Sequence, residues 1–220
     1  MSTAYNSKIV TDGLVSYCDF ANKRSYDSTA PTVVTDLITT NTGVITGATS
    51  HDGSNLDLDG TISNASNGRV LLPTLPAVTD YTIEIAFRND GPGHTGEQWA
   101  TLFGDAQARR LLVNPSGGPL LAQMGGGNHT STTATVPGQW NQVSFVYDSG
   151  ETESHWYING EPAGTASGAR VCPTTSYLGS YDAVHYWFDG PMGFVRLYNT
   201  VLTDAQIKQN FNAIRGRYGI

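Results

Sequence analysis

The stretch that decides the fold is FVRLYNTVLTDAQIKQNFNAIRGRYGI, residues 194–220, at the end of a chain of 220 residues. Residues 194–199 read as a strand, and Thr200-Val201-Leu202 connects them to residues 203–215, which have the pattern of a short helix. A helix of this length does not persist by itself, so it must pack on an apolar surface. The strand that precedes it indicates that this surface is a sheet.

The expected helix carries signals at both ends. Thr203 is a favoured N-cap residue, and Gln206 can complete a capping box, in which each side chain satisfies the other residue's backbone N–H. Gly216 supplies the expected stop. Apolar residues recur at helical spacing and predict the face that packs on the sheet: Ile207, Phe211 and Ile214.

The composition favours a single all-β domain. Charged residues make up only 14% of the chain, and 25 glycines accompany many threonines, serines and asparagines, which suits strands joined by tight turns. A chain of 220 residues can bury roughly 70% of the surface of its unfolded form. We expect an N-terminal arm over residues 1–12 and one domain over residues 13–220.

The charge balance argues against nucleic acid as a partner. The 12 basic and 19 acidic residues give a net charge of −7, and basic residues cluster at most in pairs such as Arg109-Arg110. The N-terminus has no signal segment, and no apolar run is long enough to cross a membrane. We therefore expect a protein made in the cytoplasm, without membrane contact, in which Cys18 and Cys172 are buried, reduced thiols.

Alternation of apolar and polar residues predicts many strands. The pattern is clear in residues 81–87 and 143–147, while residues 156–158 and 161–163 flank Asn159-Gly160, a type I′ hairpin signal. Further strands are expected near residues 14–20, 56–58, 70–72, 111–113, 120–123 and 177–178. Turn residues separate these segments, which is typical of a sandwich of two sheets.

Six short motifs occur in an order typical of one superfamily. They are GLVSYCDFAN (13–22), LDLDG (56–60), YTIEIAF (81–87), GQWNQV (138–143), YING (157–160) and LGS (178–180). With the strand-to-helix ending, they make the chain resemble the laminin-G-like branch of the concanavalin A-like lectin/glucanase superfamily. This resemblance implies an all-β fold, a two-sheet antiparallel jelly-roll sandwich with a short C-terminal helix.

The ending NFNAIRGRYGI, residues 210–220, is similar to that of single-domain members found among structural proteins of tailed bacteriophages. This resemblance implies a non-enzymatic protein of the virion, a capsid decoration or tail-associated surface protein. Its partners would be other virion proteins such as the major capsid protein, and it would form a homo-oligomer. The alternative is a lectin-like module that recognises glycans of the host surface.

Catalysis by a family glucanase needs a Glu-x-Asp-x-x-Glu strand, in which alternate carboxylates share one face. This sequence has no such strand. Glu151 and Glu153 have the spacing of two residues, but they lie in a segment that reads as a hairpin turn. We therefore predict no catalytic residues and no enzymatic activity.

Calcium-binding members of the superfamily tend to carry acids where this chain has Ile62-Ser63 and Gly193-Phe194. Asp59 and Asp189 remain as the candidate ligands, although carboxylates in turns commonly cap backbone N–H groups instead. The five histidines show no zinc-ligand spacing. We expect no metal and no other cofactor.

Exposed aromatic rings beside amides and carboxylates are typical of sugar-binding sites, because a ring packs on the apolar face of a pyranose. Trp99, which follows a polar loop, is one candidate. The second is a cluster around Asp182 that contains Tyr181, His185, Tyr186 and Trp187. For both, the alternative is packing in the core or at an interface.

Overall fold

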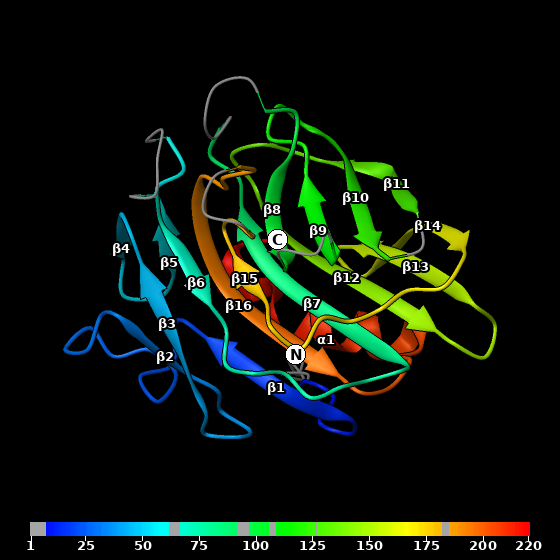
Figure 1. Cartoon of the computed structure of the whole chain (residues 1–220), viewed down its shortest axis with the longest axis horizontal. Coiled ribbons are helices and arrows are strands. Elements are labelled where there is room, and N and C mark those ends of the chain that lie inside the picture. The colour runs from blue at the N-terminus through cyan, green and yellow to red at the C-terminus, as the bar shows by residue number, and fades with distance from the viewer. Residues whose placement is uncertain (1–7, 62–66, 92–96, 106–108, 126, 182–184) are drawn as a thin grey trace, which may run out of the picture.

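The computed structural model describes residues 8–61, 67–91, 97–105, 109–125, 127–181 and 185–220. In this part of the chain two antiparallel sheets, each of eight strands, lie face to face (Figure 1). One helix, α1 (Asp204–Tyr218), covers the outer side of one sheet. The predicted all-β sandwich with a C-terminal helix is confirmed.

The sheet under α1, here called the helix sheet, has the strand order β14-β13-β12-β7-β16-β5-β4, and β1 pairs with β16. The central strands β7 and β16 pair with each other. The strands of the helix sheet are β1 (Leu14–Asp19), β4 (Thr49–His51), β5 (Leu56–Leu58), β7 (Tyr81–Arg88), β12 (Trp140–Asp148), β13 (Glu153–Ile158), β14 (Glu161–Ser167) and β16 (Gly190–Tyr198).

The other sheet, here called the second sheet, has the strand order β11-β10-β9-β8-β15-β6-β3-β2. Its outer face is turned away from α1. The strands of the second sheet are β2 (Val33–Thr35), β3 (Thr42–Thr46), β6 (Arg69–Leu71), β8 (Ala100–Gly104), β9 (Arg109–Val113), β10 (Gly118–Met124), β11 (Asn128–Thr135) and β15 (Tyr177–Leu178).

The core lies between the two sheets, and β7 shows how the sequence builds it. The predicted alternation holds, because the inward side chains of this strand are at most 1% exposed: Tyr81, Ile83, Ile85 and Phe87. Burial of each such side chain stabilises the fold by roughly 1.5–3 kcal/mol. Glu84, on the opposite face of β7, lies under α1 instead, where it meets Asn210.

Helix α1 begins as the sequence predicts. Thr203 and Gln206 form the capping box, since each side chain bonds the backbone N–H of the other residue. The predicted apolar stripe is buried: Ile207, Phe211 and Ile214. The docking of this short helix on the helix sheet is therefore confirmed.

The expected end of α1 is wrong. The helix runs through Gly216 to Tyr218 and ends at Gly219, which has a left-handed backbone with φ 71°. The ring of Tyr218 packs against that of Trp140, with 4.4 Å between centroids. This contact holds the last residues in the helix, and Gly219 supplies the conformation that ends it.

A buried ion pair lies between the helix sheet and α1. Glu84 and Arg196 are 3.2 Å apart with almost no exposure, and Asn210 donates to the same carboxylate oxygen at 3.0 Å. Burial raises the pKa of Glu84, and this effect outweighs the stabilisation of its charge by the Arg196 guanidinium. Because both charges are paired and hydrogen-bonded, the polar face of β7 can be covered by a helix.

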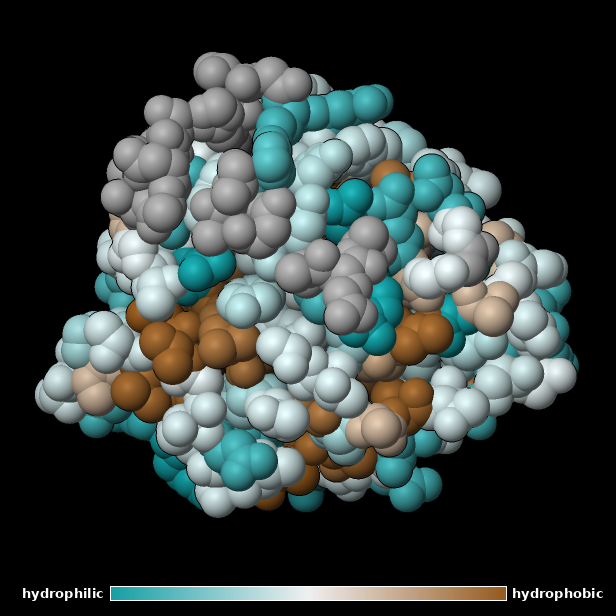
Figure 2. All heavy atoms as spheres, viewed as in Figure 1, coloured by the Kyte–Doolittle hydropathy of each residue, from teal (hydrophilic) through white to brown (hydrophobic). Residues whose placement is uncertain are grey.

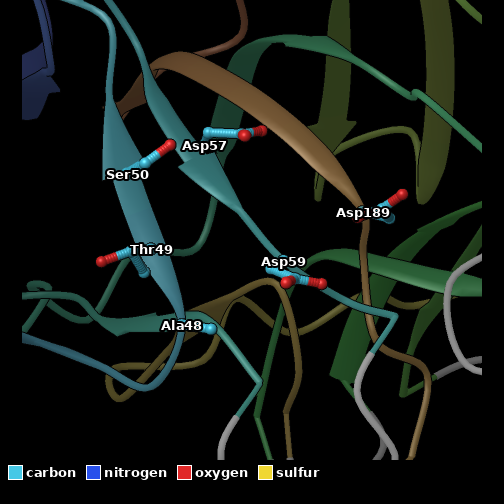
Figure 3. Close-up of a pocket in the computed structure, with 6 residues that line it drawn as sticks. All are labelled: Ala48, Thr49, Ser50, Asp57, Asp59 and Asp189. Carbon is cyan, nitrogen blue, oxygen red and sulfur yellow. The ribbon is translucent and has the colours of Figure 1, made fainter.

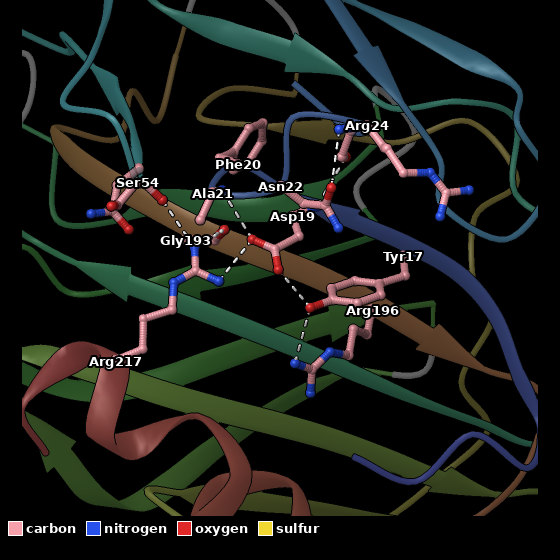
Figure 4. Close-up of polar contacts among 12 residues, drawn as sticks. Tyr17, Asp19, Phe20, Ala21, Asn22, Arg24, Ser54, Gly193, Arg196 and Arg217 are labelled. Carbon is pink, nitrogen blue, oxygen red and sulfur yellow. Dashed lines mark hydrogen bonds and ion pairs between the residues drawn. The ribbon is translucent and has the colours of Figure 1, made fainter. Parts of the chain in front are cut away.

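A second polar cluster joins the end of α1 to β1 (Figure 4). Asp19 accepts hydrogen bonds from the Tyr17 hydroxyl at 2.7 Å and from Arg217 at 2.8 Å. Arg196 donates to the Tyr17 hydroxyl at 3.4 Å. These bonds fix the C-terminal end of α1 to the helix sheet, so α1 covers this part of the outer face of the sheet.

The expected N-terminal arm lies partly outside the described residues, which begin at Lys8. Val10 is already buried, and its backbone N–H donates to Asn210 of α1 at 2.7 Å. The last residues of the segment expected as an arm, 1–12, are therefore packed on the helix.

The Asn159-Gly160 turn and the two cysteines agree with the sequence predictions. Asn159 and Gly160 have φ of 53° and 74°, as a type I′ turn requires, so the predicted hairpin is confirmed. Cys18 and Cys172 are buried and free, in agreement with the prediction. Among the described residues, no helix is both long and apolar enough to cross a membrane.

Candidate functional site

The outer face of the second sheet carries a row of residues that crosses its eight described strands. Cross-strand pairing places these residues in register: Asn128, Gln123, Arg110, Gly104, Tyr177, Leu71, Val44 and Val33. The row is polar at its β11 end and apolar at its β2 end, where Val33 and Val44 are exposed. Figure 2 shows hydrophobic residues gathered over β3 and β6 on this face.

The loop between β15 and β16 lies against β8, next to this row. The backbone N–H of Thr101 donates to the carbonyl of Tyr186 at 2.8 Å, and the N–H of Tyr186 donates to the carboxylate of Glu97. Tyr186 has a positive φ of 57°, a conformation that costs energy for a residue with a side chain. The bonds to Thr101 and Glu97 therefore hold the backbone of Tyr186 in this strained conformation.

This arrangement brings two tyrosine rings to Arg110 of β9. The ring centroids of Tyr181 and Tyr186 lie 5.6 Å apart, and Cζ of Arg110 lies 4.4 Å and 4.6 Å from them. A guanidinium over the faces of aromatic rings is attracted by their π electrons. The three side chains thus hold one another in place, and we call them the tyrosine–arginine platform.

A hollow of about 230 Å³ adjoins the platform and is lined by Arg110, Gln123, Gly125, Gly127 and Asn128. Arg110 Nε donates to Gln123 Oε1 at 2.6 Å, and Gln123 Nε2 donates to Asn128 Oδ1 at 3.0 Å. The chain of bonds fixes a guanidinium and two amides along the wall. Such a wall can offer directional donors and acceptors to hydroxyl groups.

The platform contains part of the predicted glycan cluster. Tyr181 and Tyr186 are two of its three side chains. The exposed ring of His185 lies beside Tyr186 with 6.4 Å between the ring centroids. Trp187 is only 2% exposed, so the prediction for this residue is corrected: its ring packs in the interior and has no face for a sugar. Trp99 is half-buried just before β8. Asp182 lies outside the described residues.

Sequence reasoning missed the strand residues of the site, Arg110, Gln123 and Asn128. A signal for two of them existed, because Arg110 precedes the buried Leu111 and Gln123 follows the buried Ala122, so each must point outward. No local pattern, however, indicates that two tyrosines from much later in the chain lie against Arg110.

A second hollow, of about 290 Å³, is acidic (Figure 3). It is lined by Ala48, Thr49, Ser50, Asp57, Asp59 and Asp189. Asp57 and Asp59 lie on and just after β5, Asp189 directly precedes β16, and the pairing of β5 with β16 brings the three aspartates to the wall of the same hollow. Burial raises the pKa of Asp57 and of Asp189, and neighbouring aspartates add to both increases.

Asp59 and Asp189, the sequence candidates for a cation, both cap the backbone. Asp59 accepts from the N–H of Thr61 at 2.9 Å, and Asp189 accepts from the N–H of Gly60 at 3.2 Å. Their expected alternative role as caps is therefore confirmed. Among the described residues, which exclude Ile62-Ser63, no group of three or more His, Cys, Asp or Glu side chains could hold a metal ion.

A third hollow, of about 640 Å³, lies between β12–β14 and the start of α1. His155 and Tyr157 line it, and the Tyr157 hydroxyl donates to Asp204 at 2.7 Å. Asp148, also in its wall, accepts from the N–H groups of Gly150 and Glu151, so Glu151 lies in the predicted hairpin turn, whereas Glu153 already begins β13. The carboxylates of Asp148 and Asp204 thus hold the turn and the tyrosine in place.

Several solved structures share this architecture, whereas no curated protein matches the sequence. Domain 4 of AbnA, an extracellular arabinanase from Geobacillus stearothermophilus in complex with arabinotriose, has a TM-score of 0.62 at 20% identity, over 90% of this chain and 97% of that one. A putative carbohydrate binding protein from Bacteroides ovatus has a TM-score of 0.51 at 22% identity, over 62% and 42%. The binding domain of botulinum neurotoxin DC in complex with SialylT has a TM-score of 0.63 at 11% identity, over 92% and 52%. This chain therefore spans about half or less of the last two, and the likeness to all three is one of fold.

The sequence itself also matches a protein family. Residues 63–208 match the concanavalin A-like lectin/glucanases superfamily, a range that includes β6, β16 and the first turn of α1. The two antiparallel sheets and the strand-to-helix ending agree with that match. On this evidence the chain belongs to the concanavalin A-like lectin/glucanases superfamily.

Proposed function

We propose that this protein binds carbohydrate without hydrolysing it, and that the tyrosine–arginine platform and its hollow form the binding site. The observation that carries the proposal is the position of Arg110 over the rings of Tyr181 and Tyr186, beside the amide of Gln123. The platform combines the two kinds of surface that a sugar needs. Its rings can pack on the apolar face of a pyranose, and its amides and guanidinium can bond the hydroxyls.

Preorganisation supports the same proposal. Tyr181, Tyr186 and Arg110 are half-buried, and the loop that carries the tyrosines is bonded to Thr101 and Glu97. A site whose side chains are already ordered loses less conformational entropy when a ligand binds. Similar folds solved with arabinotriose and with SialylT add support for binding as the role.

The lack of hydrolysis is proposed from the positions of the acids. Glu97, the acid bonded to the platform loop, holds the backbone of Tyr186, while Asp59 and Asp189 of the acidic hollow cap backbone N–H groups. Glycoside hydrolysis needs a pair of carboxylates on either side of the scissile bond. These acids support the loops instead.

Titration of neutral and charged oligosaccharides from a glycan array tests the proposal. Tyr181→Ala and Tyr186→Ala should each weaken binding roughly tenfold, which corresponds to about 1.4 kcal/mol. Two control variants probe the other candidate sites. Trp99→Ala alters the other aromatic candidate and His155→Ala alters the third hollow, and both should leave the affinity unchanged. The proposal fails if no oligosaccharide binds, or if the two tyrosine variants bind as tightly as the wild type.

As a second candidate we keep attachment to the particle of a tailed phage, which residues 210–220 favour by their resemblance. Part of this segment serves packing, because Asn210, Phe211, Ile214 and Tyr218 are buried. The two functions are compatible, since a virion surface protein could also bind glycans of the host. Mass spectrometry of purified particles should find several copies, and deletion of residues 2–8 should weaken attachment while leaving the fold intact. A truncated protein that loads at full occupancy would place the contact on the sandwich instead.

A further inference from the structure

Two arginines on the outer face of the second sheet lie over tyrosine rings. Arg110 lies over Tyr181 and Tyr186, and Arg69 of β6 lies over Tyr177 of β15, with 5.3 Å between its Cζ and the ring centroid. Arg69 Nε also donates to Thr46 at 3.4 Å. The same arrangement of cation on aromatic ring therefore occurs twice on one face.

Neither arginine has a carboxylate partner among the described residues. By contrast, four other arginines pair with acids: Arg88 with Asp90, Arg109 with Asp105, Arg196 with Glu84 and Arg217 with Asp19. In a chain of net charge −7, acids are more numerous than bases, so two half-buried arginines on one face without an acid are notable. No acid in the described part of the chain neutralises their charge at close range.

Arg110 also has spare donors. Within the described residues its side chain donates through Nε to Gln123, while its Nη1 is shielded from solvent and has no hydrogen-bond partner. An unpaired donor in a shielded position is unfavourable, and the fork of a guanidinium matches a carboxylate or sulfate. Nη1 itself is out of reach of an external ligand, but Arg110 also lines the hollow, where an oxyanion would meet its guanidinium.

The register gives the separation of the two arginines. Arg110 lies in the row that runs through Gly104 and Tyr177 to Leu71, and Arg69 lies two residues from Leu71 on the same face. Three strand spacings and this offset put the two backbone positions about 15 Å apart. Tyr177 lies between them. One small anion cannot reach both sites, whereas an extended chain can.

We propose that the ligand is an acidic polysaccharide that crosses the strands of the second sheet, with one oxyanion on Arg110 and another on Arg69. This inference rests on the proposed carbohydrate binding and adds the class of glycan. The ring of Tyr177 would support the sugars between the two charged positions. Carboxylated and sulfated glycans share the required chemistry, and they are separated by the test.

The test compares one sugar backbone with and without charge. Oligogalacturonate of six sugars should bind at least tenfold more tightly than its fully methyl-esterified form, and raising the salt concentration should weaken its binding. A sulfated galactan oligosaccharide of the same length identifies which oxyanion is preferred. These measurements use the wild-type protein, so they do not depend on the folding of any variant.

Substitutions of single arginines then test which residues bind the charged groups of the ligand. Arg110→Gln and Arg69→Gln should each reduce affinity for the acidic oligosaccharide at least fivefold, and Arg110→Lys should restore only part of it because lysine lacks the fork. Arg215→Gln is the matched control: it removes the same charge from an exposed position on α1, beyond the opposite sheet, and should leave affinity unchanged. Melting temperatures report whether each variant folds.

The outcomes separate this inference from the function on which it rests. Equal binding of the charged and esterified forms, or equal losses in Arg110→Gln and Arg215→Gln, overturns the acidic ligand while carbohydrate binding stands. Binding of single-stranded DNA with the affinity of the best glycan would overturn it in favour of a general polyanion site. Failure of every glycan, neutral ones included, overturns both proposals.

Discussion

Gly104 of β8 lies directly opposite Arg110 of β9, and a Cβ atom added at residue 104 would fall 2.6 Å from the Cβ of Arg110. The backbone of β9 lies only 3.0 Å from the same point. Atoms cannot approach so closely without a shift of one strand. Glycine at this position therefore allows Arg110 to stand beside β8 and to reach the tyrosine rings.

Gly104→Ala should weaken glycan binding at least fivefold, because the new methyl group displaces Arg110 from the platform. Titration of an oligosaccharide that the wild type binds measures this effect. Gly216→Ala is its control, since a Cβ there meets nothing within 4 Å, and alanine within a helix should add roughly 0.5–1 kcal/mol of stability. Unchanged affinity in a folded Gly104→Ala variant would show that the platform does not bind the sugar.

The docking of α1 can be tested at Phe211, which is 5% exposed and belongs to a cluster with Phe194 and Tyr218. Phe211→Ala should lower the free energy of unfolding by roughly 3–5 kcal/mol, since it removes a buried ring and leaves a cavity. Urea unfolding measures this loss. Asn212→Ala, an exposed change on the same helix, should have almost no effect. An unchanged midpoint for Phe211→Ala would contradict the docking.

Stability should depend on pH through His129. This side chain is 3% exposed, its Nδ1 lies 2.9 Å from the Ser154 hydroxyl, and burial together with the charge of Arg170 lowers its pKa from 6.5 to about 4. At a pH between about 4 and 6.5, His129 therefore binds a proton in the unfolded chain but not in the folded protein. The free energy of unfolding should therefore fall as the pH drops below 6.5, by up to about 3 kcal/mol once the pH is below 4.

Urea unfolding of the wild type and of His129→Gln between pH 7 and pH 4.5 measures this contribution. The difference in stability between the two proteins should shrink as the pH falls, because the variant has no proton to bind at this position. A difference that stays constant with pH would assign the acid sensitivity to other groups.

The acidic hollow should need no metal ion. Asp59 and Asp189 already hold the N–H groups of Thr61 and Gly60, so we expect the melting temperature to be the same in EDTA and in millimolar calcium. Thermal unfolding monitored by circular dichroism is the measurement. Stabilisation by calcium that Asp189→Asn abolishes would identify a cation site at this place.

Much of the fold is predictable because its signals are local. The alternation of β7 and the capping box of α1 depend on residues a few positions apart, and both match the structure. Four strands of the second sheet were not predicted: β2, β3, β8 and β11. β8 is buried along its whole length, so it lacks alternation, and β11 is made mostly of small polar residues.

The site was only partly predictable, for a related reason. The tyrosines are conspicuous in the sequence, but neighbouring residues can point to opposite sides: Tyr186 is half-exposed, whereas Trp187 is buried. Their partner Arg110 belongs to β9, far earlier in the chain. That contact depends on how one loop folds back over the sheet, which residue spacing does not encode.

The position of β16 has a consequence for the order of events during translation. This strand pairs with β1, β5 and β7, and it occupies residues 190–198 of a chain of 220. On the ribosome, β1 emerges long before β16, and it waits for this partner while the strands between them are made. Pairing over such a sequence separation is slow, and unpaired strand edges invite aggregation. The nascent chain should therefore complete the helix sheet only after β16 has been made, and translation products that stop before residue 190 should be insoluble or degraded.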